Sequence, residues 1–151
     1  ICNAGHPRPL LYCAATKTWE LIDDTIETKL EGLMNLSLGI IEPTDYYQFA
    51  VQLFPGDYVV LYTDGYTDIR CDGETLGEQG LMEVVRGLSF TSAAELGEGI
   101  RQSLGMNDPD YARVDDETLI VLAPQDQPPP KFSLLKRLET MGKMLELVRI
   151  R

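Results

Sequence analysis

The first apolar segments of the chain predict a β-hairpin. Pro9–Ala14 is a short apolar run, and Trp19–Asp23 is a second one that follows the polar residues Thr16–Thr18. Two apolar runs separated by a short polar turn are typical of paired antiparallel strands. We therefore expect a hairpin between residues 9 and 23.

Two further strands are predicted before residue 63. Apolar residues alternate with other residues from Tyr47 to Leu53, which is the period of a strand with one buried face. The turn signal Pro55–Asp57 follows. Tyr58–Tyr62 is then apolar almost throughout, which predicts a central strand covered on both faces.

The apolar spacing changes to a helical period in the second half of the chain. Glu78–Leu88 places its apolar residues on one helical face, and Thr91 or Ser92 can cap a second helix that ends at Gly105. Thr118–Leu122 predicts a last strand. Strands, then helices, then a strand favour an α+β domain over alternating β-α units.

The proline-rich residues 124–131 predict a linker after a domain that spans residues 1–123. Beyond the linker, residues 132–151 carry leucines at helical spacing with lysines and arginines between them. This pattern predicts a basic amphipathic helix that docks on its own domain or pairs with a second copy. Docking of its basic face on an anionic lipid or an acidic partner is the alternative. Because the chain begins inside an apparent strand at Ile1, we expect the first strands of the fold to lie upstream.

Charge and cysteine content exclude several classes of protein. The formal net charge of −11 disfavours a nucleic-acid partner, because such binding depends on lysine and arginine. Cys2, Cys13 and Cys71 show no C-x-x-C spacing, which argues against a zinc site or a disulfide framework and favours a reducing cytoplasm. Every apolar run is shorter than the roughly 20 residues of a membrane-spanning helix.

Two acidic clusters stand at the ends of predicted strands. Thr63–Gly65 follows one strand, and Asp115–Thr118 precedes the other. Carboxylates held at strand ends, without converging histidine or cysteine, favour a hard cation such as Mg²⁺ or Mn²⁺. Gly65 leaves room for an ion or for its waters. The alternative is that both clusters are ordinary solvated turns.

Four motifs together resemble one protein family. Leu53–Gly65, with the sequence LFPGDYVVLYTDG, resembles the L-x-P-G-D-x-hydrophobic-L-Y-T-D-G signature of bacterial metal-dependent protein phosphatases of the PPM class, SpoIIE-type branch. Asn3–Leu11 is similar to the N-A-G-H-x-P strand of that branch. Leu38–Ile40 resembles its L-G turn, and Asp115–Leu119 resembles its terminal D-D-x-T motif.

The resemblance implies two antiparallel sheets packed face to face, with helices outside, around two Mn²⁺ or Mg²⁺ ions. It places Asp64 and Asp115 at metal-ligand positions. Asp116 stands where related eukaryotic enzymes have asparagine. Asp116 and Gly65 are expected either beside the metal ligands or in contact with a metal ion. His6 occupies a position that carries an aspartate for an accessory metal in some relatives. We expect His6 to lie near the substrate or to hydrogen-bond the turn before Pro7, without ligating metal.

The implied activity is hydrolysis of phosphoserine or phosphothreonine by a metal-activated water. The implied substrate is a phosphorylated regulatory protein, such as an anti-anti-sigma-like domain. The family's bridging ligand comes from an upstream G-D-x-x-G-H/K-G motif that this sequence does not contain, so we expect residues 1–151 alone to be inactive. A non-catalytic interaction module with a phosphatase-like fold is the competing hypothesis. A third is an acidic domain whose aspartates only form turns.

Overall fold

The computed structural model describes residues 1–22, 37–40, 46, 48, 50–71, 73–113 and 115–125. The predicted helix over residues 132–151 and most of the predicted linker lie outside this range. Within it the helices and strands follow the predicted order of an α+β fold. They are β1 (Leu10–Cys13), β2 (Thr18–Leu21), β3 (Tyr58–Tyr62), the 3-10 helix η1 (Asp64–Tyr66), β4 (Arg70–Cys71), β5 (Glu74–Thr75), α1 (Gly77–Arg86), α2 (Ala93–Ser103) and β6 (Leu119–Leu122).

The main sheet has four antiparallel strands in the order β2-β1-β3-β6. The register pairs Leu10 with Leu21 on one side and with Val60 on the other, and it pairs Val60 with Val121. The predicted hairpin and the central position of β3 are therefore confirmed. A separate two-stranded pair, β4-β5, lies between η1 and α1 in the chain.

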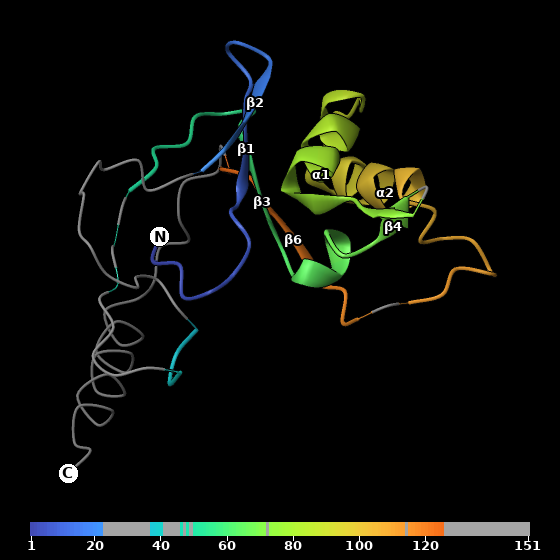
Figure 1. Ribbon diagram of the computed structural model, residues 1–151. Helices are drawn as coiled ribbons and strands as arrows, with labels where there is room; N and C mark the ends of the chain where they lie inside the picture. The colour runs from blue at the N-terminus through green and yellow to red at the C-terminus, as the bar shows by residue number, and fades with distance from the viewer. Residues whose placement is uncertain are drawn as a thin grey trace, which may run out of the picture.

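Both helices pack on one face of the sheet (Figure 1). Because strand side chains alternate between faces, Val60 and Tyr62 of β3 point to the same side as Leu10 of β1. This side forms the core with the apolar faces of α1 and α2. The fully buried contributors from the helices are Leu81, Val85, Leu96 and Ile100.

The ends of α2 follow directly from the sequence. The Ser92 hydroxyl accepts a hydrogen bond from the Glu95 N–H at 3.2 Å, and the Glu95 carboxylate accepts from both the backbone and the hydroxyl of Thr91 at 2.8 Å. These reciprocal bonds hold the start of the helix, and the two bonds from Thr91 lower the pKa of Glu95. Gly105 takes φ +70° just after the helix. Of the two candidate cap residues, Ser92 is the N-cap, and the predicted stop at Gly105 is confirmed.

Asp57 anchors the turn that precedes β3. The residue is 4% exposed, and its carboxylate accepts hydrogen bonds from the Phe54 N–H at 2.8 Å and the Ala14 N–H at 2.9 Å. The first bond closes the Pro55–Asp57 turn, and the second ties that turn to the end of the β1–β2 hairpin. A turn predicted from local sequence therefore also makes a long-range link.

One strand prediction needs correction. Residues 50–53 lie outside any strand, and Gln48 forms only an isolated antiparallel bridge with Cys2. Alternation predicts that a strand has one buried face, but a strand also needs a neighbouring strand to pair with. In the described part of the chain, only Cys2 pairs with this segment, through Gln48. β3 has buried residues on both faces, as predicted: Val60 and Tyr62 face the helices, and Val59 on the other side is 3% exposed, with Leu61 half-buried beside it.

The described residues contain only part of the expected sandwich of two antiparallel sheets. Besides the four-stranded sheet, residues 1–125 contain, where they are described, only the small β4-β5 pair as a second sheet. The helices that cover the main sheet correspond to one outer layer of such a sandwich. Neither α1 nor α2 is long and apolar enough to cross a membrane, and no other described helix is.

Candidate metal-binding site

The loop after β3 is held in place by its own backbone. The Asp64 carbonyl accepts hydrogen bonds from the Thr67 N–H at 2.7 Å, the Asp68 N–H at 2.8 Å and the Thr67 hydroxyl at 3.0 Å. The Tyr66 N–H also bonds the Thr63 carbonyl at 3.0 Å. These bonds wind the chain into η1, while the Asp64 side chain stays exposed at the end of the rigid strand.

The segment before β6 is bound to this loop through Thr63. Its N–H donates to the Thr118 carbonyl at 3.1 Å, and its hydroxyl accepts from the Thr118 N–H at 2.9 Å. The same hydroxyl donates to the Asp116 carbonyl at 2.7 Å. The β3–β6 ladder is thus continued into both acidic segments, which lie against each other.

Gly65 makes the closest approach between the two segments. A Cβ atom at this position would lie 2.5 Å from the Asp116 carbonyl oxygen and 3.2 Å from Cγ of Glu117. Any residue larger than glycine would therefore push the acidic segments apart. The sequence predicts that glycine at position 65 leaves room for an ion or its waters. In the structure, the atom next to Gly65 is the Asp116 carbonyl oxygen.

The side chains of Asp64, Asp115 and Asp116 are exposed and form no ion pair within the described part of the chain. The Asp115 carboxylate accepts one hydrogen bond, from the Asp116 N–H at 2.7 Å. Exposed carboxylate oxygens without a cationic partner are suitable ligands for Mg²⁺ or Mn²⁺. They fit part of a metal site only, because the described residues hold no group of three or more potential ligand side chains around one position.

His6 lies near these loops, but its role in the local turn differs from the one expected. The turn is closed by the Asn3 side chain, which accepts from the His6 N–H at 2.9 Å and donates to the His6 carbonyl at 2.8 Å. Asn3 performs this task because its amide carries a donor and an acceptor, whereas the His6 imidazole is exposed. His6, Thr63 and Thr118 line one apolar hollow of about 460 Å³ on the face of the sheet that points away from the helices.

Glu117 is a residue near the site that the sequence does not single out. It stands in the acidic run Asp115–Thr118, yet its side chain is only 2% exposed. Its carboxylate accepts a hydrogen bond from the Tyr111 hydroxyl at 2.9 Å and lies 3.5 Å from Nε of Arg113. Burial, together with Glu117, raises the pKa of Tyr111 to about 12. Glu117 therefore stabilises the loop that leads into the acidic segment. The nearby Tyr111 is the only sequence feature that could have indicated a buried partner for this carboxylate.

The N-A-G-H segment is fixed to the helical layer by Arg8. Its side chain forms a salt bridge with Glu78 in the first turn of α1 at 2.6 Å, and its backbone N–H bonds the same carboxylate at 2.8 Å. The Arg8 carbonyl accepts from the Tyr62 hydroxyl at 2.8 Å, and burial raises the pKa of Tyr62. This cluster joins β3, α1 and the segment around His6 into one support for the loops.

A second hollow, of about 590 Å³, opens on the helix side of the acidic loops between α2 and β6. Tyr66, Glu117 and Thr118 line it from the loops, and Arg101 lines it from α2. The Arg101 guanidinium is 3.4 Å from the Tyr66 hydroxyl. A basic group therefore stands beside an otherwise acidic site.

Residues 1–125 match the family model for Stage II sporulation protein E (SpoIIE). The chain belongs to the SpoIIE family. Over 120 residues it is 32% identical to the phosphoserine phosphatase RsbU of Bacillus subtilis (strain 168), an alignment that covers 80% of this chain and 33% of the relative. The chain thus spans about a third of the length of that SpoIIE-like relative.

The fold also has a solved counterpart. The SiaA-PP2C domain of Pseudomonas aeruginosa superposes with a TM-score of 0.55 at 18% identity, covering 78% of this chain and 44% of the other. At this identity the likeness concerns the fold alone. Together with the family match, it confirms the resemblance to the SpoIIE-like branch and the α+β PPM-type fold, of which this chain forms part.

Proposed function

We propose that the SpoIIE domain to which residues 1–125 belong is a metal-dependent phosphatase that hydrolyses phosphoserine or phosphothreonine in a regulatory protein. The observation that carries the proposal is the contact between the two acidic segments. Thr63 bonds the Asp116 carbonyl, and Gly65 leaves no space between the loops. Family membership and the phosphoserine phosphatase RsbU as a relative support the reaction class.

Asp64 and Asp115 would hold Mn²⁺ or Mg²⁺, with at least one further carboxylate from outside the described residues. In such sites a pair of divalent ions neutralises phosphate charge and provides hydroxide at neutral pH. The chain's own contribution is positional. The ladder bonds between Thr63 and Thr118 fix the two carboxylate segments at the ends of β3 and β6. Gly65 lets these segments approach, and Glu117 and Arg8 brace them from either side.

Arg101 is a candidate for contact with the substrate, because it lies in the hollow next to the acidic loops. A guanidinium can bind phosphate oxygens with two parallel hydrogen bonds. For the substrate we propose a phosphorylated anti-anti-sigma-like regulator in the cytoplasm, a choice supported by the motif resemblance. Residues 132–151 would then dock on the acidic body of the domain or pair with a second copy.

The test is Mn²⁺-dependent hydrolysis of a phosphoserine peptide by the natural protein that contains this chain. Asp64→Asn should reduce turnover by at least about a hundredfold, a loss comparable with removal of other groups that stabilise the transition state. Glu83→Gln, which neutralises an exposed carboxylate on α1, is the matched control and should leave turnover unchanged. Residues 1–151 alone should show no metal-dependent activity.

Two outcomes would contradict this proposal. Full turnover by Asp64→Asn would remove the assigned metal ligand from the reaction. Binding of the phosphopeptide by the natural protein, with no hydrolysis at any Mn²⁺ or Mg²⁺ concentration, would instead favour the non-catalytic interaction module.

A further inference from the structure

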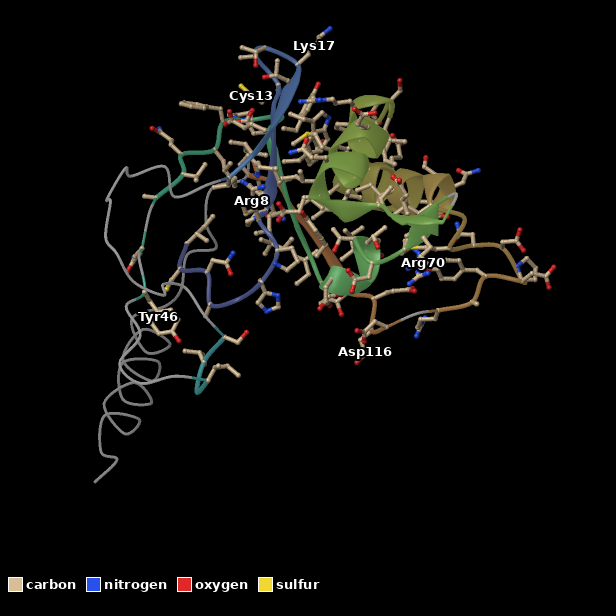
Figure 2. All side chains as sticks on the ribbon, viewed as in Figure 1. Arg8, Cys13, Lys17, Tyr46, Arg70 and Asp116 are labelled. Carbon is tan, nitrogen blue, oxygen red and sulfur yellow. The ribbon has the colours of Figure 1, made fainter. Side chains whose placement is uncertain are left out.

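A groove of about 620 Å³ crosses the end of the molecule that lies away from the acidic loops. Figure 2 shows its lining residue Lys17 at the tip of the β1–β2 hairpin, and Asp116 at the opposite end of the described body. The groove is bounded by the hairpin, by the end of α1 and by the segment before α2. Its main lining residues are Tyr12, Lys17, Trp19, Arg86, Leu88 and Phe90.

The floor of the groove is a packed aromatic cluster. The Phe90 ring meets Tyr12 at a centroid distance of 5.0 Å, Tyr58 at 5.4 Å and Trp19 at 5.9 Å, each in an edge-to-face arrangement. This geometry is the one that aromatic pairs prefer, so the floor is held rigid before anything binds. Rigid aromatic surfaces reduce the entropy lost on association and are enriched in protein interfaces.

The rim of the groove is basic in an acidic protein. Lys17 and Arg86 line it and form no ion pair with any residue that the structure describes. Two other arginines, Arg8 and Arg113, are paired with glutamates. The chain as a whole carries a net charge of −11. An acidic ligand is therefore repelled by most of this surface and finds favourable charge at the groove.

We propose that this site, the Lys17–Arg86 groove, binds an acidic segment of a partner protein. An apolar side chain of the segment rests on Phe90 and Tyr12, and carboxylates on either side of it face Lys17 and Arg86. Charge complementarity selects this occupant over a neutral or basic peptide. The site does not depend on the proposed phosphatase reaction, because it shares no residue with the acidic loops.

The probe is a short synthetic peptide in which glutamates flank a central leucine, and its matched control replaces every glutamate with glutamine. Binding to the intact chain is measured by titration calorimetry. The position of binding is measured by the emission of Trp19, which is the single tryptophan of these 151 residues and lines the groove. We expect saturable heat and a saturable change in emission with the glutamate peptide alone.

Three variants test the assignment. Arg86→Gln and Lys17→Asn should each weaken binding about twofold to fivefold, the range for one exposed ion pair. Asparagine suits position 17, where φ is +56°, because it tolerates the left-handed region better than most residues. Arg70→Gln removes the same charge from an exposed side chain of β4, which lies away from Lys17 in Figure 2, and should have no effect.

Each contrary result has a defined meaning. Absence of saturable heat, equal binding of the glutamine peptide, or equal weakening by Arg70→Gln would overturn the proposal. Binding of phosphatidylserine vesicles through Lys17 and Arg86, without binding of the acidic peptide, would assign the groove to a membrane surface and would also overturn it.

Discussion

Replacement of Gly65 by alanine tests the contact on which the candidate site depends. The new Cβ would lie 2.5 Å from the Asp116 carbonyl oxygen, whereas ordinary contact begins at 3.4 Å, so one loop must move by about 0.9 Å. Gly65 is not among the glycines with positive φ, so alanine adds no backbone strain there. The perturbation is therefore a steric one between the two acidic segments.

The expected cost follows from that displacement. A shift of Asp116 lengthens the 2.7 Å bond from the Thr63 hydroxyl, and a typical hydrogen bond contributes about 0.5–1.5 kcal/mol. Overpacking of a close contact generally costs about 1–3 kcal/mol. We expect Gly65→Ala to lower the free energy of unfolding by about 2 kcal/mol, measured by urea denaturation. Mn²⁺ affinity of the natural protein should fall as well.

Gly97→Ala is the matched control, since its Cβ would meet Val121 and Leu119 at 3.7 and 3.8 Å, which is ordinary contact. Inside α2 the change should stabilise the protein by about 0.5–1 kcal/mol, because alanine is the better helix former. The same chemical change thus has opposite signs at Gly65 and Gly97. Wild-type stability and Mn²⁺ affinity in Gly65→Ala would refute the close approach of the two loops.

Three further predictions concern stability. Asp57→Asn should cost about 1–3 kcal/mol in urea denaturation, because an amide has one acceptor oxygen where the carboxylate receives two backbone N–H bonds. Ser92→Ala should cost about 1 kcal/mol through loss of the α2 cap, whereas Ser103→Ala at the other end should cost little. The pKa of Tyr111 is raised to about 12 from 10.0, so above pH 10 the unfolded chain releases this proton first and stability falls as pH rises. Tyr111→Phe should lose less stability than wild type between pH 10 and 12 in thermal unfolding, and identical losses would contradict the burial of this phenol.

The main elements of the fold could be predicted because their signals are local. The apolar run of β3, the polar turn of the hairpin and the cap at Ser92 each act within a few residues. The strand predicted between Tyr47 and Leu53 was wrong over residues 50–53 because pairing depends on a neighbour that alternation does not reveal. The covering of a sheet face is likewise decided by distant segments.

The candidate site was predictable to a similar degree. The sequence identifies the acidic segments at the ends of β3 and β6, and the bond from Thr63 to the Asp116 carbonyl shows that the two segments are in contact. The burial of the Glu117 side chain could not be predicted, because runs of acidic residues are usually exposed to solvent. A buried carboxylate needs a partner such as Tyr111, and only the tertiary structure shows that partner. The roles of Asp64 and Asp115 as metal ligands remain predictions.

The most direct test of those roles is a double-mutant cycle of Mn²⁺ affinity, measured by calorimetry on the natural protein that contains this chain. Asp64→Asn and Asp115→Asn should each weaken binding by at least about tenfold, and the double variant should lose much less than the two single losses combined, because both carboxylates serve one site. Unchanged affinity in either single variant, or losses that simply add, would contradict a shared cation between the ends of β3 and β6.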